Sequence, residues 1–166
     1  MKVLQVVGYK NSGKTTMTSL FIEYANELGY MVGSCKRHAH GAPDVVQQTD
    51  SYKHQAAGAI IAGVEGGGML NLSIKGTVWS LKKILSYYEL LQLDLIIAEG
   101  FKTESYQKVV LLRGEQDLPL LEQVENVIGV LYPKNCEIDH KAGITYIEKE
   151  NVDEIKQWFK ESVLRA

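Results

Sequence analysis

The segment Gly8-Tyr9-Lys10-Asn11-Ser12-Gly13-Lys14-Thr15 (GYKNSGKT) separates two runs of apolar residues that differ in spacing. The run before it, Val3 to Val7 (VLQVV), is short and β-branched, as in a strand buried on both faces. The run after it, from Met17 to Leu28, has helical spacing and stops at Gly29. The segment itself matches G-x-x-x-x-G-K-[ST], whose glycines let the backbone turn closely around phosphate oxygens. These features predict a phosphate-binding loop (P-loop) between a strand and a helix.

Each residue type in this loop has a chemical role. Backbone amides at the start of the helix point inward, and the helix N-terminus adds about half a positive charge. Lys14 is expected to place a cation on the outer phosphates, and the Thr15 hydroxyl is a hard oxygen ligand for Mg²⁺. We predict that the following residues bind the nucleotide phosphates: Gly8, Asn11, Ser12, Gly13, Lys14, Thr15 and Thr16.

A second oxygen ligand is expected at the end of a neighbouring strand. The apolar run Leu93 to Ala98 ends in Glu99 and Gly100. Glu99 is predicted to hold Mg²⁺ directly or through water, or to orient the attacking water, which makes it the catalytic partner of Lys14. Asp94, at the start of the same strand, is interpreted as a solvated strand-entry residue.

Strand-like and helix-like runs alternate along the chain. This alternation predicts one α/β domain over residues 1–166, with the three-layer P-loop NTPase fold: a mostly parallel central sheet and helices on both faces. Because ligands sit at the carboxyl ends of parallel strands, the polar junctions Gly8–Thr15, Lys36–Ser51 and Glu99–Lys102 should meet on one edge. The expected strands are Val3–Val7, Met31–Cys35, Ala59–Val64, Met69–Ile74 (paired with the preceding one as a hairpin), Leu93–Ala98, Lys108–Leu112 and Val127–Leu131.

The composition argues against several classes of partner. The net charge is −2 and the 18 basic residues form no block, so bulk attraction to nucleic acid or acidic lipid is not expected. No apolar stretch approaches the ~20 residues of a membrane span, and the first residues lack the pattern of a signal peptide. Cys35 and Cys136 form no CxxC pair and are expected as reduced thiols, which indicates a cytoplasmic protein.

Further segments carry a family resemblance. The P-loop, Lys36–Gly41 (KRHAHG), Thr49–Ala59 (TDSYKHQAAGA) and Ala98–Lys102 (AEGFK) occur in order, and with them the chain resembles the MobB-type proteins of molybdopterin-guanine dinucleotide biosynthesis. The resemblance implies a GTP-binding, weakly GTP-hydrolysing accessory protein that works as a homodimer. Its implied partner is the molybdopterin guanylyltransferase that joins GMP to molybdopterin, and molybdopterin itself is a further candidate ligand.

Other polar residues near the expected edge have two interpretations each. Lys36, His38 and His40 are candidates to bind a pterin phosphate or the nucleotide, or they form a solvated loop. Asp50 either caps the helix that follows Thr49 or helps to hold Mg²⁺. Lys102 faces the bound phosphates or a partner, or is an exposed lysine.

Three functions remain open from the residues alone: an adaptor with slow GTPase activity, a kinase for a small metabolite, and a nucleotide or pterin carrier without turnover. A kinase usually needs arginines in a mobile lid. Arg37, Arg113 and Arg165 are the only arginines, and none lies in a glycine-flanked lid segment, so slow hydrolysis is expected. The guanine-reading pattern [NT]-K-x-D is absent, which leaves Asn135 as the candidate for base recognition.

Overall fold

The computed structural model describes residues 1–38, 49–76 and 78–165. The chain divides into two compact units, one made of Met1–Arg37 and Leu85–Ala166 and the other of His38–Ile84. This division into compact units does not test whether residues 1–166 form a single domain, which stays a prediction.

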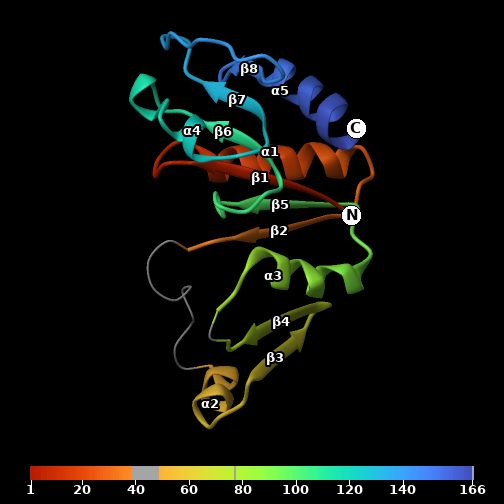
Figure 1. Ribbon diagram of the computed structural model, residues 1–166. Helices are drawn as coiled ribbons and strands as arrows, with labels where there is room; N and C mark the ends of the chain where they lie inside the picture. Colours follow the sequence, from red (N-terminus) through yellow and green to blue (C-terminus); the bar gives the residue numbers. More distant parts are fainter. Residues whose placement is uncertain (39–48, 77, 166) are drawn as a thin grey trace. The chain divides into compact units, whose positions relative to one another are not determined.

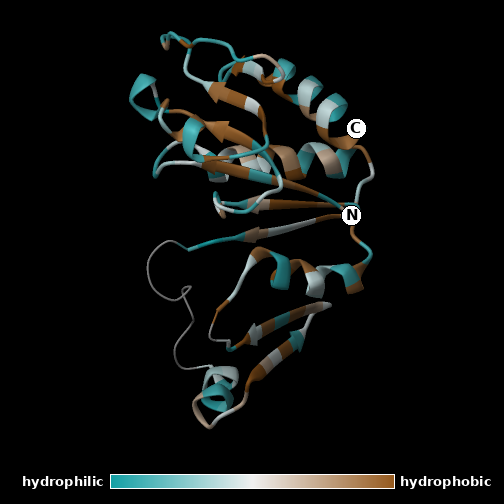
Figure 2. Ribbon diagram, viewed as in Figure 1, coloured by the Kyte–Doolittle hydropathy of each residue, from teal (hydrophilic) through white to brown (hydrophobic). Residues whose placement is uncertain are grey.

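The first unit is built on a parallel sheet. Six strands pair in the described part of this unit, in the order β2-β5-β1-β6-β7-β8, and every pairing is parallel. Figure 1 shows these strands side by side, and Figure 2 shows hydrophobic colour along β6 and β7. The predicted α/β fold with a mostly parallel sheet is confirmed. The strands are β1 (Lys2–Gly8), β2 (Val32–Lys36), β5 (Leu95–Glu99), β6 (Gln107–Leu111), β7 (Val127–Tyr132) and β8 (Thr145–Glu148).

Apolar side chains cover both faces of this sheet. On one face, α1 (Lys14–Glu27) and α5 (Val152–Phe159) pack together, and the rings of Phe21 and Phe159 stack with centroids 4.4 Å apart. On the other face, Leu120 of α4 (Leu120–Gln123) packs with Val110 and other strand residues. Burial of such side chains supplies most of the driving force for this arrangement. The 3₁₀ turn η2 (Glu115–Asp117) precedes α4, and the π-helical turn η3 (Lys160–Leu164) follows α5.

The helix ends follow the local sequence signals. Gly29, just after α1, has a φ of 84°, which glycine adopts without strain. The Asn151 side chain caps α5 by accepting a hydrogen bond from the Glu154 amide, and it donates one to the Glu154 carboxylate. No helix in the described residues is both long and apolar enough to cross a membrane.

The second unit holds a helix and a hairpin. Thr49 caps α2 (Asp50–Ala56) by accepting a hydrogen bond from the Tyr52 amide. Strands β3 (Ile61–Gly66) and β4 (Met69–Ile74) pair antiparallel, which confirms the predicted hairpin. Helix α3 (Leu81–Tyr88) begins in this unit and ends in the first, and η1 (Glu89–Leu91) follows it.

Helix α3 begins at Leu81, because the Ser80 hydroxyl accepts a hydrogen bond from the Lys83 amide and so caps the helix there. One strand differs from the expectations. Strand β8 was missing from the predicted set. It is a four-residue edge strand in which only Ile147 is fully buried, so the apolar alternation of a half-buried strand is hardly visible.

Candidate functional site

The P-loop joins β1 to α1 in a tight turn. Asn11 and Gly13 have φ values of 64° and 92°, in the left-handed region. A Cβ on Gly8 would lie 2.7 Å from the Leu111 carbonyl oxygen of the neighbouring strand, so only glycine fits there. Gly13 caps α1 without a side-chain hydrogen bond. The first amides of the helix are therefore left for an anion.

Two polar side chains of the loop, those of Lys14 and Ser12, keep hydrogen-bonding capacity for a ligand. Burial lowers the pKa of Lys14, with Lys36 and Arg113 adding to this effect and Glu99 opposing it. Its ammonium group donates to the Tyr9 carbonyl oxygen at 2.7 Å. The Ser12 hydroxyl is buried and has no hydrogen-bond partner in the described part of the chain. A bound phosphate would satisfy both groups, so the residues present fit a nucleotide phosphate.

Thr15, Lys36 and Glu99 meet at the carboxyl edge of the sheet. The Thr15 hydroxyl lies 3.0 and 3.2 Å from the two carboxylate oxygens of Glu99. The Lys36 ammonium lies 3.0 Å from Glu99 Oε1 and 3.1 Å from Thr15 Oγ1. This contact arises because Lys36 and Glu99 are register partners at the ends of β2 and β5. The hydroxyl and carboxylate oxygens fit Mg²⁺, which takes few protein ligands and completes its shell with phosphate and water.

The loop after β5 is held from inside the sheet. The buried Gln5 side chain donates to the carbonyl oxygen of Phe101 at 2.5 Å, and Phe101 is itself buried. Gly100 has a φ of 90°, which allows the chain to turn directly after Glu99. The strand and the turn together set the position of the Glu99 carboxylate.

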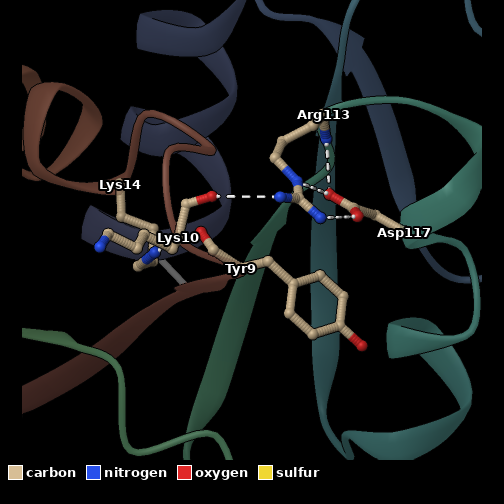
Figure 3. Close-up of polar contacts among 5 residues, drawn as sticks. All are labelled: Tyr9, Lys10, Lys14, Arg113 and Asp117. Carbon is tan, nitrogen blue, oxygen red and sulfur yellow. Dashed lines mark hydrogen bonds and ion pairs between the residues drawn. The ribbon is translucent and has the colours of Figure 1, made fainter. Parts of the chain in front are cut away.

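An arginine that was not among the predicted site residues contacts the P-loop. Arg113 follows β6 and donates from Nη1 to the Lys10 carbonyl oxygen at 3.3 Å, while its other nitrogens bind Asp117 (Figure 3). Its guanidinium carbon lies 5.3 Å from the centroid of the Tyr9 ring. The available signal was an arginine and an aspartate four residues apart, directly after a predicted strand.

The remaining predicted residues have different environments. The Lys102 ammonium lies 5.8 Å from the centroid of the Tyr9 ring, and so borders the loop. His38 is exposed, and His40 lies outside the described residues. Asp50 is not the cap of α2, because Thr49 fills that position; its exposed carboxylate binds Lys53 at 2.9 Å. A role for Asp50 at Mg²⁺ stays a prediction.

A cavity of about 360 Å³ opens beside the P-loop. One wall comes from the loop and the first turn of α1, and another from the turn after β8. Asn135, the sequence candidate for base recognition, is not among its lining residues. Those residues are Asn11, Ser12, Gly13, Thr16, Met17, Leu111, Lys149 and Glu150.

The chain is similar in sequence and fold to known proteins. A family model described as molybdopterin guanine dinucleotide synthesis protein B (MobB) matches residues 3–132. The chain belongs to the MobB family. The matched range includes the P-loop, Lys36, Glu99, Arg113 and Asp117, and it ends before the turn after β8.

Relatives of the MobB family align over most of the chain. The Bacillus subtilis protein named "Probable molybdopterin-guanine dinucleotide biosynthesis adapter protein" is 37% identical over 86% of this chain and 82% of its own length. A Haemophilus influenzae molybdopterin-guanine dinucleotide biosynthesis adapter protein is 30% identical over 82% of this chain and 78% of its own. The structure of a MobB homologue from Bacillus stearothermophilus superposes over the full length of both chains with a TM-score of 0.81 at 32% identity. The MobB fold of P-loop NTPase type is thereby confirmed.

Proposed function

We propose that this MobB-family protein binds GTP with Mg²⁺ at its P-loop and serves as an adapter for the enzyme that attaches GMP to molybdopterin. The observation that carries the nucleotide part is the contact of Thr15 with Glu99 beside the uncapped amides of α1. The names of the relatives support the adapter part.

The chain's own groups divide the work of binding. The amides of Asn11 to Thr15 receive the phosphates, and Lys14 turns from the Tyr9 carbonyl oxygen to the outer phosphate oxygens. The Thr15 hydroxyl and the Glu99 carboxylate hold Mg²⁺, which neutralises phosphate charge when bound. The buried Glu99 carboxylate and the exposed Thr15 hydroxyl already lie within hydrogen-bond distance of each other, so both oxygens can reach one ion with little rearrangement.

Hydrolysis is proposed to be slow. An arginine that stabilises the transferring phosphate accelerates such reactions by about 10³–10⁵-fold. Arg113 is near the loop, but its guanidinium is already bound to Asp117 and to the Lys10 carbonyl oxygen. The same bonds support the second candidate, a nucleotide or pterin carrier without turnover.

Assembly and partners complete the proposal. We propose a homodimer that acts in the cytoplasm with a molybdopterin guanylyltransferase, with molybdopterin as a further ligand. These features rest on the family membership and on the resemblance of the KRHAHG and AEGFK segments.

One set of measurements tests the proposal. GTP, ATP and molybdopterin are titrated separately against the purified protein, with and without Mg²⁺, while phosphate release and the rate of GMP attachment by the partner enzyme are recorded. We expect Mg²⁺-dependent GTP binding, slow phosphate release and a faster attachment reaction. GTP binding without any effect on attachment would contradict the adapter role, and rapid phosphate transfer to a small acceptor would favour a kinase.

A further inference from the structure

The cavity beside the P-loop continues the surface that receives phosphates. Asn11, Ser12 and Gly13 belong to the loop, and they also line the cavity. A nucleotide whose phosphates lie in the loop must place its sugar and base next to it. At about 360 Å³ the cavity is within the range of small-ligand sites, about 300–1,000 Å³. It is therefore a site of suitable size for the nucleoside.

The wall opposite the loop is held rigidly by the sheet and by α5. The Lys149 amide donates to the Tyr132 carbonyl oxygen at 2.8 Å, which extends the pairing of β7 with β8. Two residues later, the Asn151 amide donates to the Glu148 carbonyl oxygen at 3.0 Å, and Asn151 also caps α5. Lys149 and Glu150 therefore stand on a turn that is fixed on both sides.

These two side chains offer complementary hydrogen-bonding groups. The Glu150 carboxylate only accepts hydrogen bonds, and the Lys149 ammonium only donates them. Both residues line the cavity together with Asn11, Ser12 and Gly13 of the P-loop. Guanine presents two adjacent donors, N1–H and N2–H₂, beside the acceptor O6. Adenine presents an acceptor at N1 and a donor at N6, so a carboxylate at this edge pairs with guanine and repels the acceptor of adenine.

We infer that the cavity is the base site and that Glu150 selects guanine by accepting from N1–H and N2–H₂, with Lys149 bordering O6. This inference rests on the proposed binding of a nucleoside triphosphate at the P-loop. It names the determinant of base choice in a chain whose sequence lacks [NT]-K-x-D.

The test is a set of Mg²⁺-triphosphate titrations on three proteins: the wild type, Glu150→Gln, and the control Glu148→Gln in the same strand and turn. The probes are GTP, ATP and XTP, whose base carries a C2 carbonyl oxygen in place of the guanine amine. We expect Glu150→Gln to lose about 10- to 100-fold in GTP affinity, to bind XTP more tightly than the wild type does, and to bind ATP within about two-fold. The control should keep the wild-type ratio of GTP to ATP affinity.

Other outcomes separate failure of this inference from failure of the proposed function. An unchanged GTP-to-ATP ratio in Glu150→Gln would show that the base is read elsewhere. An equal loss of all three nucleotides would show that Glu150 only supports the loop, and would also overturn the inference. If the wild type binds no triphosphate, the proposed function itself fails, and the base site with it. A gain in XTP affinity requires a folded protein, so misfolding cannot imitate the expected result.

Discussion

Asp117 accepts three hydrogen bonds from Arg113, one from its backbone amide and two from its guanidinium, at distances of 2.6 to 2.9 Å. The Asp117 side chain is almost fully buried, at 1% exposure, whereas that of Arg113 is partly exposed. The fourth bond of Arg113 goes to the Lys10 carbonyl oxygen in the P-loop (Figure 3). A buried carboxylate thus orients the guanidinium that contacts the backbone of the phosphate loop.

Asp117→Asn should therefore destabilise the protein at neutral pH. One partner of a buried, charge-assisted pair is lost, which costs about 1–3 kcal/mol in the free energy of unfolding. The cost should depend on pH, because hydrogen bonds from the Arg113 side chain lower the pKa of Asp117 below its ordinary value of 3.8. The stabilisation is complete above that value and is lost as the pH falls through the lower pKa of the folded state. Urea unfolding of both proteins between pH 7 and pH 3 checks this, since the difference should shrink only at the acid end.

Lys14→Ala should abolish triphosphate binding in a folded protein. Among the residues that the structure describes, the Lys14 ammonium donates only to the Tyr9 carbonyl oxygen of its own loop, so little stability depends on it. Loss of one charged hydrogen-bonding group to the phosphates costs about 2–4 kcal/mol, or about 30- to 1000-fold in affinity. Lys10→Ala is a matched control, because this exposed residue contacts Arg113 through its backbone. Equal GTP affinity in the wild type and in folded Lys14→Ala would overturn the assignment of the P-loop.

Glu99→Gln should depress Mg²⁺-dependent hydrolysis while GTP binding stays within a few-fold. Glutamine keeps the size of the side chain but removes the charge that faces Thr15 and Lys36 and that would position metal or water. Phosphate release at saturating GTP and Mg²⁺ is the measurement, with calorimetric binding beside it. Turnover at the wild-type rate would mean that another group holds the metal, and Asp50 would be the next residue to substitute.

Lys36→Met should lower the Mg²⁺ concentration needed for GTP binding. The Lys36 ammonium contacts Glu99 Oε1 and Thr15 Oγ1, which are the oxygens proposed to hold the metal. Because the ion pair is partly exposed, its loss should change the Mg²⁺ midpoint by about three- to five-fold. A Mg²⁺ titration at fixed GTP measures this midpoint. A higher midpoint would indicate instead that Lys36 binds the nucleotide phosphates, which is one of the roles that the sequence analysis gave to this residue.

Replacing His38 and His40 together with alanine should leave GTP affinity nearly unchanged and weaken the stimulation of GMP attachment. His38 is exposed, and both residues belong to the KRHAHG segment of the family resemblance. The two assays separate the alternatives. Weaker GTP binding would assign the segment to the nucleotide, and an unchanged rate of attachment would mean that it is solvated surface.

The sequence alone determined those features of this protein that depend on residues close to one another along the chain. The spacing of Gly8, Gly13, Lys14 and Thr15 predicted the loop, because turn geometry and helix amides are local properties. The caps that Thr49 and Asn151 form on α2 and α5 are local contacts of the same kind. Parallel strands place their carboxyl ends on one edge of the sheet. The sequence therefore also predicted that Glu99 lies close to the P-loop.

Strand order and register were decided only by the tertiary structure. Lys36, Thr15 and Glu99 share hydrogen bonds because β5 lies between β1 and β2, and Val6 and Lys36 both pair with Glu99. Arg113 reaches the loop because β6 borders β1 on its other side. Lys149 and Glu150 line the cavity only through β8, an edge strand too short to show a period. Such contacts arise from burial and backbone pairing across long stretches of chain, and a one-dimensional pattern carries no record of which strands become neighbours.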